Sequence, residues 1–345
     1  MSPIRAAVVH PSAPRGLASM QSLPLFRFGV VADVQHADIP DGSSFHGVPR
    51  YYRGALQLLQ RAVDDFKEAH VNFAMHLGDI VDFHNSVTPA EASAVRSRPD
   101  SALQDVLDIF TRLEAPVYHM LGNHCLYCHS RPVLNQRLGI SELQGGQRHS
   151  YYAVQPLAGW RVLVLDGYDV SLLGWEPGHP LHELAEETLQ ARNPNKEKNS
   201  PDGLEGTERR FVKFGGGLSD AQLVWMRGQL GEARAAGDRV VVACHLPMHP
   251  DTCPPVCLLW NYEQVLEVLQ AFPGTVVATL AGHTHRDGYC RDSAGIHHRV
   301  CAAILETPPG NDCHGIIEVF DDRIRVVGHG RFQSDDWSLG PVGHT

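Results

Sequence analysis

Two kinds of apolar pattern alternate along the first third of the chain. Short, continuous apolar runs at 26–32, 73–77 and 116–121 are typical of buried strands. Between them, apolar residues recur every three or four positions across 51–69 and 101–113, which is the spacing of an amphipathic helix. Strands that alternate with helices in this way predict an α/β layered fold with parallel strands.

The second half of the chain continues this alternation. Short apolar runs predict strands at 160–165, 239–244 and 276–281, and a helical pattern over 262–270 separates the last two. The segment 297–327 alternates short apolar runs with turns. We expect it to form antiparallel strands that close the second half of the sheet system.

Two local signals mark boundaries in this half. Ser219, followed three residues later by Gln222, predicts a capping box at the start of a helix. Asp321 and Asp322 lie between two apolar runs, and this composition suits a hairpin turn.

Between these elements lies a long stretch, 167–217, that is rich in proline and polar residues and is predicted to be irregular. A mobile lid and a decorated surface loop are both consistent with it. We therefore expect a disordered extension at 1–25, one domain over 26–332 that carries this insertion, and a tail at 333–345.

Polar motifs follow the strands at the points where the apolar runs stop. They combine carboxylate, amide and imidazole side chains, all of which bind divalent cations: Asp33-Val34-Gln35, Gly78-Asp79-Ile80-Val81-Asp82, Gly122-Asn123-His124, His245 and Gly282-His283-Thr284-His285. Ligands at the carboxyl ends of several strands converge in an open α/β sheet. Each motif alone is weak, but the ordered set predicts a site for two cations about 3.5–4 Å apart, which suits hydrolysis at phosphorus.

The types of donor in these motifs are suited to such a site. The Asp79 carboxylate can bridge two cations, and the alternation in Gly-His-Thr-His lets two imidazoles leave an extended segment on the same side. Glycines at 78, 122 and 282 would permit close backbone approach or unusual dihedral angles at the turns.

Composition limits the classes of protein that need to be considered. The chain has 345 residues and a formal net charge of −10, which argues against a protein that coats nucleic acid. No apolar run approaches the roughly 20 residues needed to span a bilayer. We expect a cytoplasmic monomer that binds neither nucleic acid nor membrane. The acid-poor leader before Asp33 leaves an organellar transit peptide as the alternative.

The motifs resemble those of the calcineurin-like metallophosphoesterase superfamily, whose pattern is Asp-x-His, Gly-Asp-x-x-Asp, Gly-Asn-His-Asp/Glu, a lone His and Gly-His-x-His. The match runs from Asp33 to His285, with Gln35 in place of the first histidine and Cys125 in place of the acid after Gly-Asn-His. The resemblance implies a four-layer α/β/β/α sandwich with two mixed β-sheets.

The Asp-x-Gln form narrows the resemblance to superfamily members that hydrolyse the diphosphate of ADP-ribose, CDP-choline, CDP-glycerol and similar conjugates. Three further segments support it: Tyr51-Tyr52-Arg53, Trp260-Asn261-Tyr262 and Ile304-Leu305-Glu306-Thr307-Pro308. The products would be a nucleoside monophosphate and a phosphorylated sugar or alcohol. A cyclic-nucleotide phosphodiesterase or a protein phosphatase on the same scaffold, and a non-catalytic scaffold, are the alternatives.

The resemblance also assigns roles to individual residues. It implies that Asp33, Gln35, Asp79 and His285 hold the first metal, and that the second is held by Asp79, Asn123, His245 and His283. An amide oxygen is harder than an imidazole nitrogen, so Gln35 favours Mn²⁺, with Mg²⁺ as the alternative. His124 would then be free to donate a proton to the departing phosphate or to hold charge on it, with a structural loop histidine as the alternative.

The remaining candidates would contact the substrate or form a separate site. They are His36 and Arg53 for the distal phosphate, and Phe45, Cys257, Trp260, Asn261 and Tyr262 around the nucleobase. Structural roles for the histidine, the arginine and the aromatic residues remain open. The pairs Cys125/Cys128 and Cys253/Cys257 could form a structural zinc site or a disulfide, although reduced cysteines are the default for a chain of this length.

Overall fold

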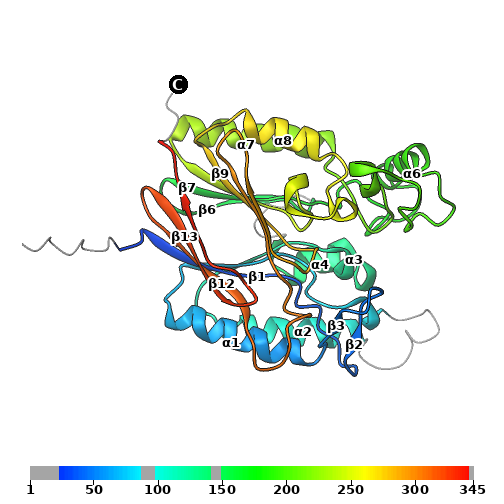
Figure 1. Ribbon diagram of the computed structural model, residues 1–345, viewed down its shortest axis with the longest axis horizontal. Coiled ribbons are helices and arrows are strands. Elements are labelled where there is room, and N and C mark those ends of the chain that lie inside the picture. Colours follow the sequence, from blue (N-terminus) through cyan, green and yellow to red (C-terminus); the bar gives the residue numbers. More distant parts are fainter. Residues whose placement is uncertain (1–22, 87–97, 141–148, 342–345) are drawn as a thin grey trace, which may run out of the picture.

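Two β-sheets lie face to face between two layers of helices (Figure 1). The computed structural model describes residues 23–86, 98–140 and 149–341. Helices α1 (Gly54–Glu68) and α2 (Arg98–Phe110) cover the outside of the first sheet. Helices α7 (Asp220–Ala236) and α8 (Tyr262–Gln270) cover the outside of the second. The predicted four-layer α/β/β/α sandwich is therefore confirmed.

The first sheet is mixed and has the order β14-β13-β12-β1-β4-β5. Its parallel half consists of β1 (Phe26–Val31), β4 (Phe73–His76) and β5 (Val117–His119). Its antiparallel half consists of β12 (Cys313–Val319), β13 (Arg323–Gly330) and β14 (Asp335–Ser338). Strand β1 joins the two halves, because it pairs with both β12 and β4.

The second sheet is also mixed and has the order β10-β11-β9-β8-β7-β6. Four parallel strands form its centre: β7 (Trp160–Val164), β8 (Arg239–Ala243), β9 (Val276–Ala281) and β11 (His297–Val300). The antiparallel edge strands are β6 (Tyr152–Leu157) and β10 (Gly288–Arg291).

Smaller elements connect these layers. The described residues form a short hairpin, β2 (Gly42–Ser43) and β3 (Pro49–Arg50), and the helices α3 (Asn123–Cys128), α4 (Arg131–Arg137) and α6 (Pro180–Arg192). Single 3-10 turns occur at Phe83–Asn85, Gly206–Arg210, Pro250–Thr252 and Pro255–Cys257. No helix of the described ranges combines the length and the apolar character that a bilayer crossing needs.

The expectation for 297–327 is partly wrong. Strand β11 runs parallel to β9 in the second sheet, whereas β12 and β13 cross to the first sheet and pair beside β1. The hairpin turn at Asp321-Asp322 is confirmed, since it joins β12 to β13. Short apolar runs fix where strands lie in the sequence but not which neighbour they choose.

Two segments have more structure than the sequence predicted. The stretch 167–217 contains α6, which begins after His179 and buries Ala185 and Leu189 in a small apolar cluster with Trp260. This cluster explains why a polar, proline-rich stretch folds. The predicted tail 333–345 contains β14, which pairs with β13, so the first sheet extends beyond residue 332.

The capping box at the start of α7 forms only in part. Ser219 accepts a hydrogen bond from the Gln222 backbone N–H (3.2 Å), as the motif predicts. The Gln222 side chain does not reach back to Ser219; it accepts from the Asp166 N–H (2.8 Å) and donates to the Asp169 carboxylate (3.1 Å). The glutamine thus ties α7 to the loop after β7.

Aromatic side chains fill part of the space between the sheets. Phe28 of β1 stacks on Phe73 of β4, with ring centroids 4.8 Å apart. Phe26 meets Trp160 of the second sheet edge-to-face at 5.4 Å. These rings belong to one buried apolar cluster that includes residues of both sheets, so the sheets share a core.

Close packing of α1 on β1 yields a stability prediction. A β-carbon on Gly29 would lie 2.6 Å from the ring of Phe66, which is fully buried in α1. We expect Gly29→Ala to lower the free energy of unfolding by about 1–3 kcal/mol, because the ring or the helix must shift. Urea unfolding followed by circular dichroism measures this change.

Gly228 on the exposed face of α7 provides the matched control. A β-carbon there meets nothing within 4 Å. Gly228→Ala should therefore raise the free energy of unfolding by about 0.5–1 kcal/mol, because it restricts the unfolded chain. A Gly29→Ala chain as stable as the parent would contradict the packing described for α1.

Candidate metal centre

All seven predicted metal ligands follow the carboxyl ends of parallel strands, six of them on loops and Asn123 at the start of α3. The loops after β1, β4 and β5 belong to the first sheet, and those after β8 and β9 belong to the second. The ligands are Asp33, Gln35, Asp79, Asn123, His245, His283 and His285. Six of the seven side chains are buried, and His283 is partly exposed. The site therefore lies where the two sheets meet.

Backbone hydrogen bonds join the loops to one another. The Gln35 N–H donates to the Asp79 carbonyl (2.9 Å) within the first sheet, and the Gly282 N–H donates to the His245 carbonyl (3.1 Å) within the second. Between the sheets, Nδ1 of His245 donates to the Leu77 carbonyl (2.7 Å). This last bond orients the His245 ring so that its Nε2 faces the site.

One group of ligands surrounds His245. Its Nε2 lies 3.4 Å from Oδ2 of Asp79 and 3.2 Å from Nδ1 of His283. One ligand atom from each of the three residues lies within 4.8 Å of the other two. Nearby, Asn123 is the first residue of α3, and its Oδ1 accepts a hydrogen bond from the Tyr168 hydroxyl (3.1 Å).

A second group surrounds Gln35. Its Nε2 donates to Oδ2 of Asp79 (3.1 Å) and lies 2.8 Å from Nε2 of His285, which is 3.4 Å from Oδ1 of Asp33. Oε1 of Gln35 is buried and has no hydrogen-bond partner. The side-chain amide that contacts Asp79 and His285 thus carries a buried oxygen that needs a partner, and a divalent cation would supply one. The residues present therefore fit a metal pair.

The backbone is held in an unfavourable conformation at the ligands themselves. Six described residues other than glycine have a positive φ, between 42° and 70°, and five of them are candidate ligands: Asp33, Gln35, Asp79, His283 and His285. Such conformations cost roughly 1–3 kcal/mol each and persist where surrounding structure imposes them, which is common at functional sites. This concentration singles out the same residues independently of the motifs.

Three glycines allow the close approach that the sequence predicted. A β-carbon at Gly78, Gly122 or Gly282 would lie 2.4, 2.0 or 2.6 Å from a side-chain atom of His245, Asp79 or Asp33, respectively. Real β-carbons do not approach other heavy atoms so closely. Any larger residue at these positions would displace a ligand.

The electrostatic field at the site is negative and favours positive charge. Burial lowers the pKa of His245, but the charge and hydrogen bond of Asp79, the charge of Asp33 and the Leu77 carbonyl together outweigh burial and raise it to about 9. The pKa of His285 likewise rises to about 9, because contacts with Asp33 and Glu306 overcome the cost of burial. Neutral His283 differs, since burial and the charge of His245 hold its pKa well below the usual value. The carboxylates thus attract either protons or metal cations.

Sequence reasoning missed three side chains that support these ligands. Glu306 lies 2.9 Å from Nδ1 of His285 and so orients that ring. A carboxylate oxygen of Asp82 lies 3.1 Å from Nδ1 of His124. Tyr168 is the third, through its bond to Asn123. Glu306 and Asp82 lie within the quoted motifs, but nothing in the sequence shows which histidine each one faces.

The substrate-contact candidates on the first sheet divide into buried and exposed residues. His36 is buried, and its Nδ1 donates to the Tyr52 carbonyl (3.1 Å), so the ring serves the fold. Arg53 is exposed and pairs with Asp38, which is more exposed still (2.6 Å). Phe45 projects fully into solvent beside the β2–β3 hairpin.

The substrate-contact candidates near α8 pack against the stretch 167–217 and the start of α7. Trp260 is buried in the small cluster with Phe211, and Asn261 bonds the backbone N–H and carbonyl of Leu218. Tyr262 lies 5.1 Å from the Arg210 guanidinium that packs over its ring. Both Trp260 and Asn261 line an open groove of about 680 Å³ between α6, α7 and α8. These contacts favour the structural interpretation of the three residues.

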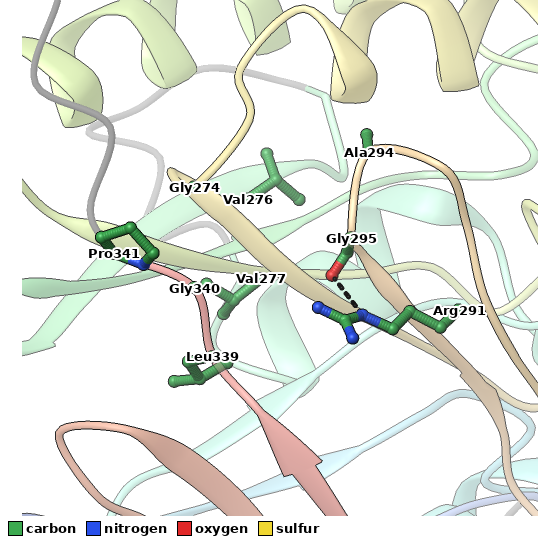
Figure 2. A pocket seen from close by; sticks show the side chains of 9 residues that line it. All are labelled: Gly274, Val276, Val277, Arg291, Ala294, Gly295, Leu339, Gly340 and Pro341. Carbon is green, nitrogen blue, oxygen red and sulfur yellow. Dashed lines mark hydrogen bonds between the residues drawn. The ribbon is translucent and has the colours of Figure 1, made fainter.

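A smaller pocket of about 120 Å³ lies away from the ligands (Figure 2). It is bounded by Val276 at the start of β9, by Leu339 after β14 and by Arg291, whose Nε donates to the Gly295 carbonyl (3.4 Å). The metal ligands follow the other end of β9, so this pocket is separate from the candidate centre.

All eight cysteines are free, so the predicted disulfide alternative is wrong. Sγ of Cys125 accepts from the Ile80 N–H (3.4 Å), and Cys128 donates to the Asp82 carbonyl (3.3 Å). These two thiols support the Asp79–Asp82 loop. Burial raises the pKa of Cys257 to about 12, and the nearby Asp33 carboxylate adds to the rise, which keeps this thiol protonated. The described residues contain no cluster of metal-ligating groups built from four cysteines.

These features define a binuclear metal hydrolase of the calcineurin type, and comparison with known proteins agrees. The family model for calcineurin-like phosphoesterases matches residues 26–287. The chain belongs to this family.

Relatives with assigned names align over nearly the whole chain. A manganese-dependent ADP-ribose/CDP-alcohol diphosphatase of Arabidopsis thaliana is 42% identical over 322 residues, covering 93% of this chain and 99% of the relative. A Homo sapiens protein of the same name is 38% identical, covering 89% and 91%. The crystal structure of a dimetal phosphatase from Danio rerio superposes with a TM-score of 0.85 at 36% identity, covering 92% of this chain and 100% of that one.

The contact between Glu306 and His285 gives a prediction about metal affinity. Glu306→Gln keeps the shape of the side chain but removes the charge that holds the His285 ring. We expect the affinity for Mn²⁺ to fall about 10–100-fold, as is usual when the partner of a ligating histidine is lost. Isothermal titration of the metal-free chain measures it.

Glu318 supplies the control, because it is a partly buried carboxylate that pairs with Arg27 on the first sheet. Glu318→Gln should bind Mn²⁺ with unchanged affinity. If Glu306→Gln also binds with unchanged affinity, Glu306 does not orient a ligand.

Proposed function

We propose that this chain is a manganese-dependent hydrolase that cleaves the diphosphate of ADP-ribose, CDP-choline, CDP-glycerol and related conjugates. The observation that carries the proposal is the position of Gln35, whose side-chain amide contacts Asp79 and His285 through Nε2 while its Oε1 is buried and unpaired. Relatives that share nearly the whole chain have this activity in their names. The products would be a nucleoside monophosphate and a phosphorylated sugar or alcohol.

The ligand geometry supports two unequal cation positions that share the Asp79 carboxylate. The first would be held by Asp33, Gln35, Asp79 and His285, and the second by Asp79, Asn123, His245 and His283. The first set has three oxygen donors and one nitrogen donor. Carboxylate and amide oxygens suit Mn²⁺ and Mg²⁺ better than softer metals, which agrees with the manganese in the relatives' names.

When bound, such a pair supplies an activated water and neutralises charge on the phosphoryl oxygens. The proton for the leaving group would come from His124 of the chain itself. Asp82 is buried and its carboxylate lies 3.1 Å from Nδ1 of His124, so it would stabilise the doubly protonated ring, whose Nε2 gives its proton to the departing phosphate. The pKa of Asp82 is lowered: burial would raise it, but hydrogen bonds from His124 and His84 and the charge of His124 outweigh burial, so Asp82 stays a charged partner.

Recognition of the conjugate would fall to the exposed residues among the candidates. The ion pair between Arg53 and Asp38 is exposed on both sides, and such pairs contribute little to stability. Arg53 could therefore exchange its partner for a phosphate, and Phe45 offers an exposed ring for stacking. The contacts of His36, Trp260, Asn261 and Tyr262 support roles in shaping the loops, while Cys257 would contact the substrate.

The remaining expectations concern the cell. A net charge of −10 supports small anionic substrates drawn in by metals rather than nucleic acid. We propose a monomer in the cytoplasm that acts without a membrane partner.

Metal removal combined with a substrate panel tests the proposed activity. The chelated chain should lose at least about 100-fold in rate, because the metals supply the nucleophile and much of the charge stabilisation. Adding Mn²⁺ should restore hydrolysis of ADP-ribose and CDP-choline, measured as release of AMP and CMP. A panel in which cyclic AMP or a phosphopeptide is the preferred substrate would instead assign one of the two alternative enzymes.

Replacement of His124 tests its role in the reaction. We expect His124→Ala to lower turnover about 10²–10⁴-fold while the bound manganese stays unchanged, because the ring donates a proton rather than a ligand. Metal content by mass spectrometry and turnover of CDP-choline provide the two measurements.

His129, at the end of the same short helix, is the matched control. His129→Ala should retain most of the turnover. Loss of manganese from His124→Ala in proportion to the loss of turnover would make His124 a ligand instead.

A further inference from the structure

A second set of metal-ligating side chains meets on the outer face of the first sheet. Asp65 lies on α1, His314 on β12 and His329 on β13. The two histidines are directly paired across the strands, and their rings stack with centroids 4.3 Å apart and planes inclined by 16°. Three different elements of secondary structure thus hold these groups in place, which favours a preorganised site.

The distances suit a single tetrahedral ion. Oδ2 of Asp65 lies 2.9 Å from Nε2 of His314 and 3.6 Å from Nδ1 of His329. Imidazole nitrogens and carboxylate oxygens bind zinc at about 2.0–2.2 Å, so two ligands of one tetrahedral ion lie roughly 3.3–3.5 Å apart. The observed distances fall on either side of this range. Small side-chain movements would therefore place all three groups around one ion.

Burial leaves one side of the triad open. His314 is fully buried, whereas the side chains of His329 and Asp65 are 33% and 37% exposed. An ion could enter from that side, and water could complete its coordination. Nε2 of His314, the nitrogen that faces Asp65, is buried and makes no hydrogen bond. The protein alone therefore leaves unpaired a nitrogen that would bind the ion.

The charges around the triad also favour a cation. Burial, together with the charge of His329, lowers the pKa of His314 to about 4, although Asp65 and Asp312 oppose the shift. The ring is thus neutral at physiological pH, with a lone pair available for a metal. The Asp312 carboxylate is engaged by Arg61 (2.6 Å), so the carboxylate that faces both rings is Asp65.

We propose that Asp65, His314 and His329 form a third metal site, which binds zinc and ties α1 to the β12–β13 hairpin. Two imidazoles and one carboxylate make a softer donor set than that around Gln35, so this site should prefer zinc to manganese. An ion bound there stabilises the folded chain, because the three ligands come together only after folding. The site is independent of the reaction at the candidate metal centre.

The test compares zinc content between matched full-length chains saturated with manganese. Each chain is incubated with zinc, dialysed against manganese buffer and analysed by mass spectrometry. We expect His329→Gln and Asp65→Asn to hold about one zinc ion per chain fewer than the parent. Zinc that enters the candidate metal centre is common to all the chains and cancels in this difference. His182→Gln on α6, outside the triad, should match the parent.

Thermal unfolding and hydrolysis give independent readouts. Zinc should raise the unfolding temperature of the parent and of His182→Gln but not that of His329→Gln. Manganese-dependent hydrolysis of CDP-choline should be alike in all the chains, which also shows that the variants fold. If His329→Gln fails to fold, Asp65→Asn decides, since it keeps the side-chain shape.

Equal zinc content in the parent and the two triad variants would overturn the proposal. Unfolding temperatures that change with pH but not with zinc would also overturn it. The three side chains would then be held together by ion pairs that depend on protonation of the histidines.

Discussion

Two buried carboxylates dominate the energetics of this molecule. Asp33 and Asp79 are almost fully buried, and the basic side chains within ion-pair distance of them among the described residues are histidines. Burying a charge without a fixed opposite charge is strongly unfavourable. The loops that carry these carboxylates must therefore hold cations or protonated imidazoles close by, and the left-handed backbone at five ligands shows how tightly they are constrained. The two sheets serve as the rigid support for this arrangement.

Much of the centre follows from the sequence because strand ends in a parallel sheet converge. Each ligand motif begins where an apolar run stops, so hydrophobic pattern and motif together place Asp33, Asp79 and His245 on neighbouring loops. The glycines at 78, 122 and 282 are explained in the same way, since any side chain there would collide with a ligand. The position of a ligand can thus be predicted from the local sequence wherever it depends only on where its own strand ends.

Other features depend on contacts that a linear pattern does not encode. The pairing of β12 with β1 is one of these features. The apolar run of β12 would look the same whichever sheet the strand joined. The fold of α6 is another, since it depends on an apolar patch completed by Trp260, some 70 residues further along the chain. Glu306 belongs to the same class: its role depends on facing His285 across two loops.

The pairing of β1 with β12 also has a consequence for how the molecule is made. The first described strand is bordered on one side by residues that lie nearly 300 positions later, at 313–319. Residues 313–319 must therefore be synthesised before that edge of β1 is covered. Until then the strand exposes unpaired backbone groups and apolar side chains, which invites association with other nascent chains. Such distant pairing also makes assembly slow. Residues 313–319 thus cover β1 late in synthesis. Truncation before them would leave the edge of β1 unpaired and make the N-terminal half prone to aggregation.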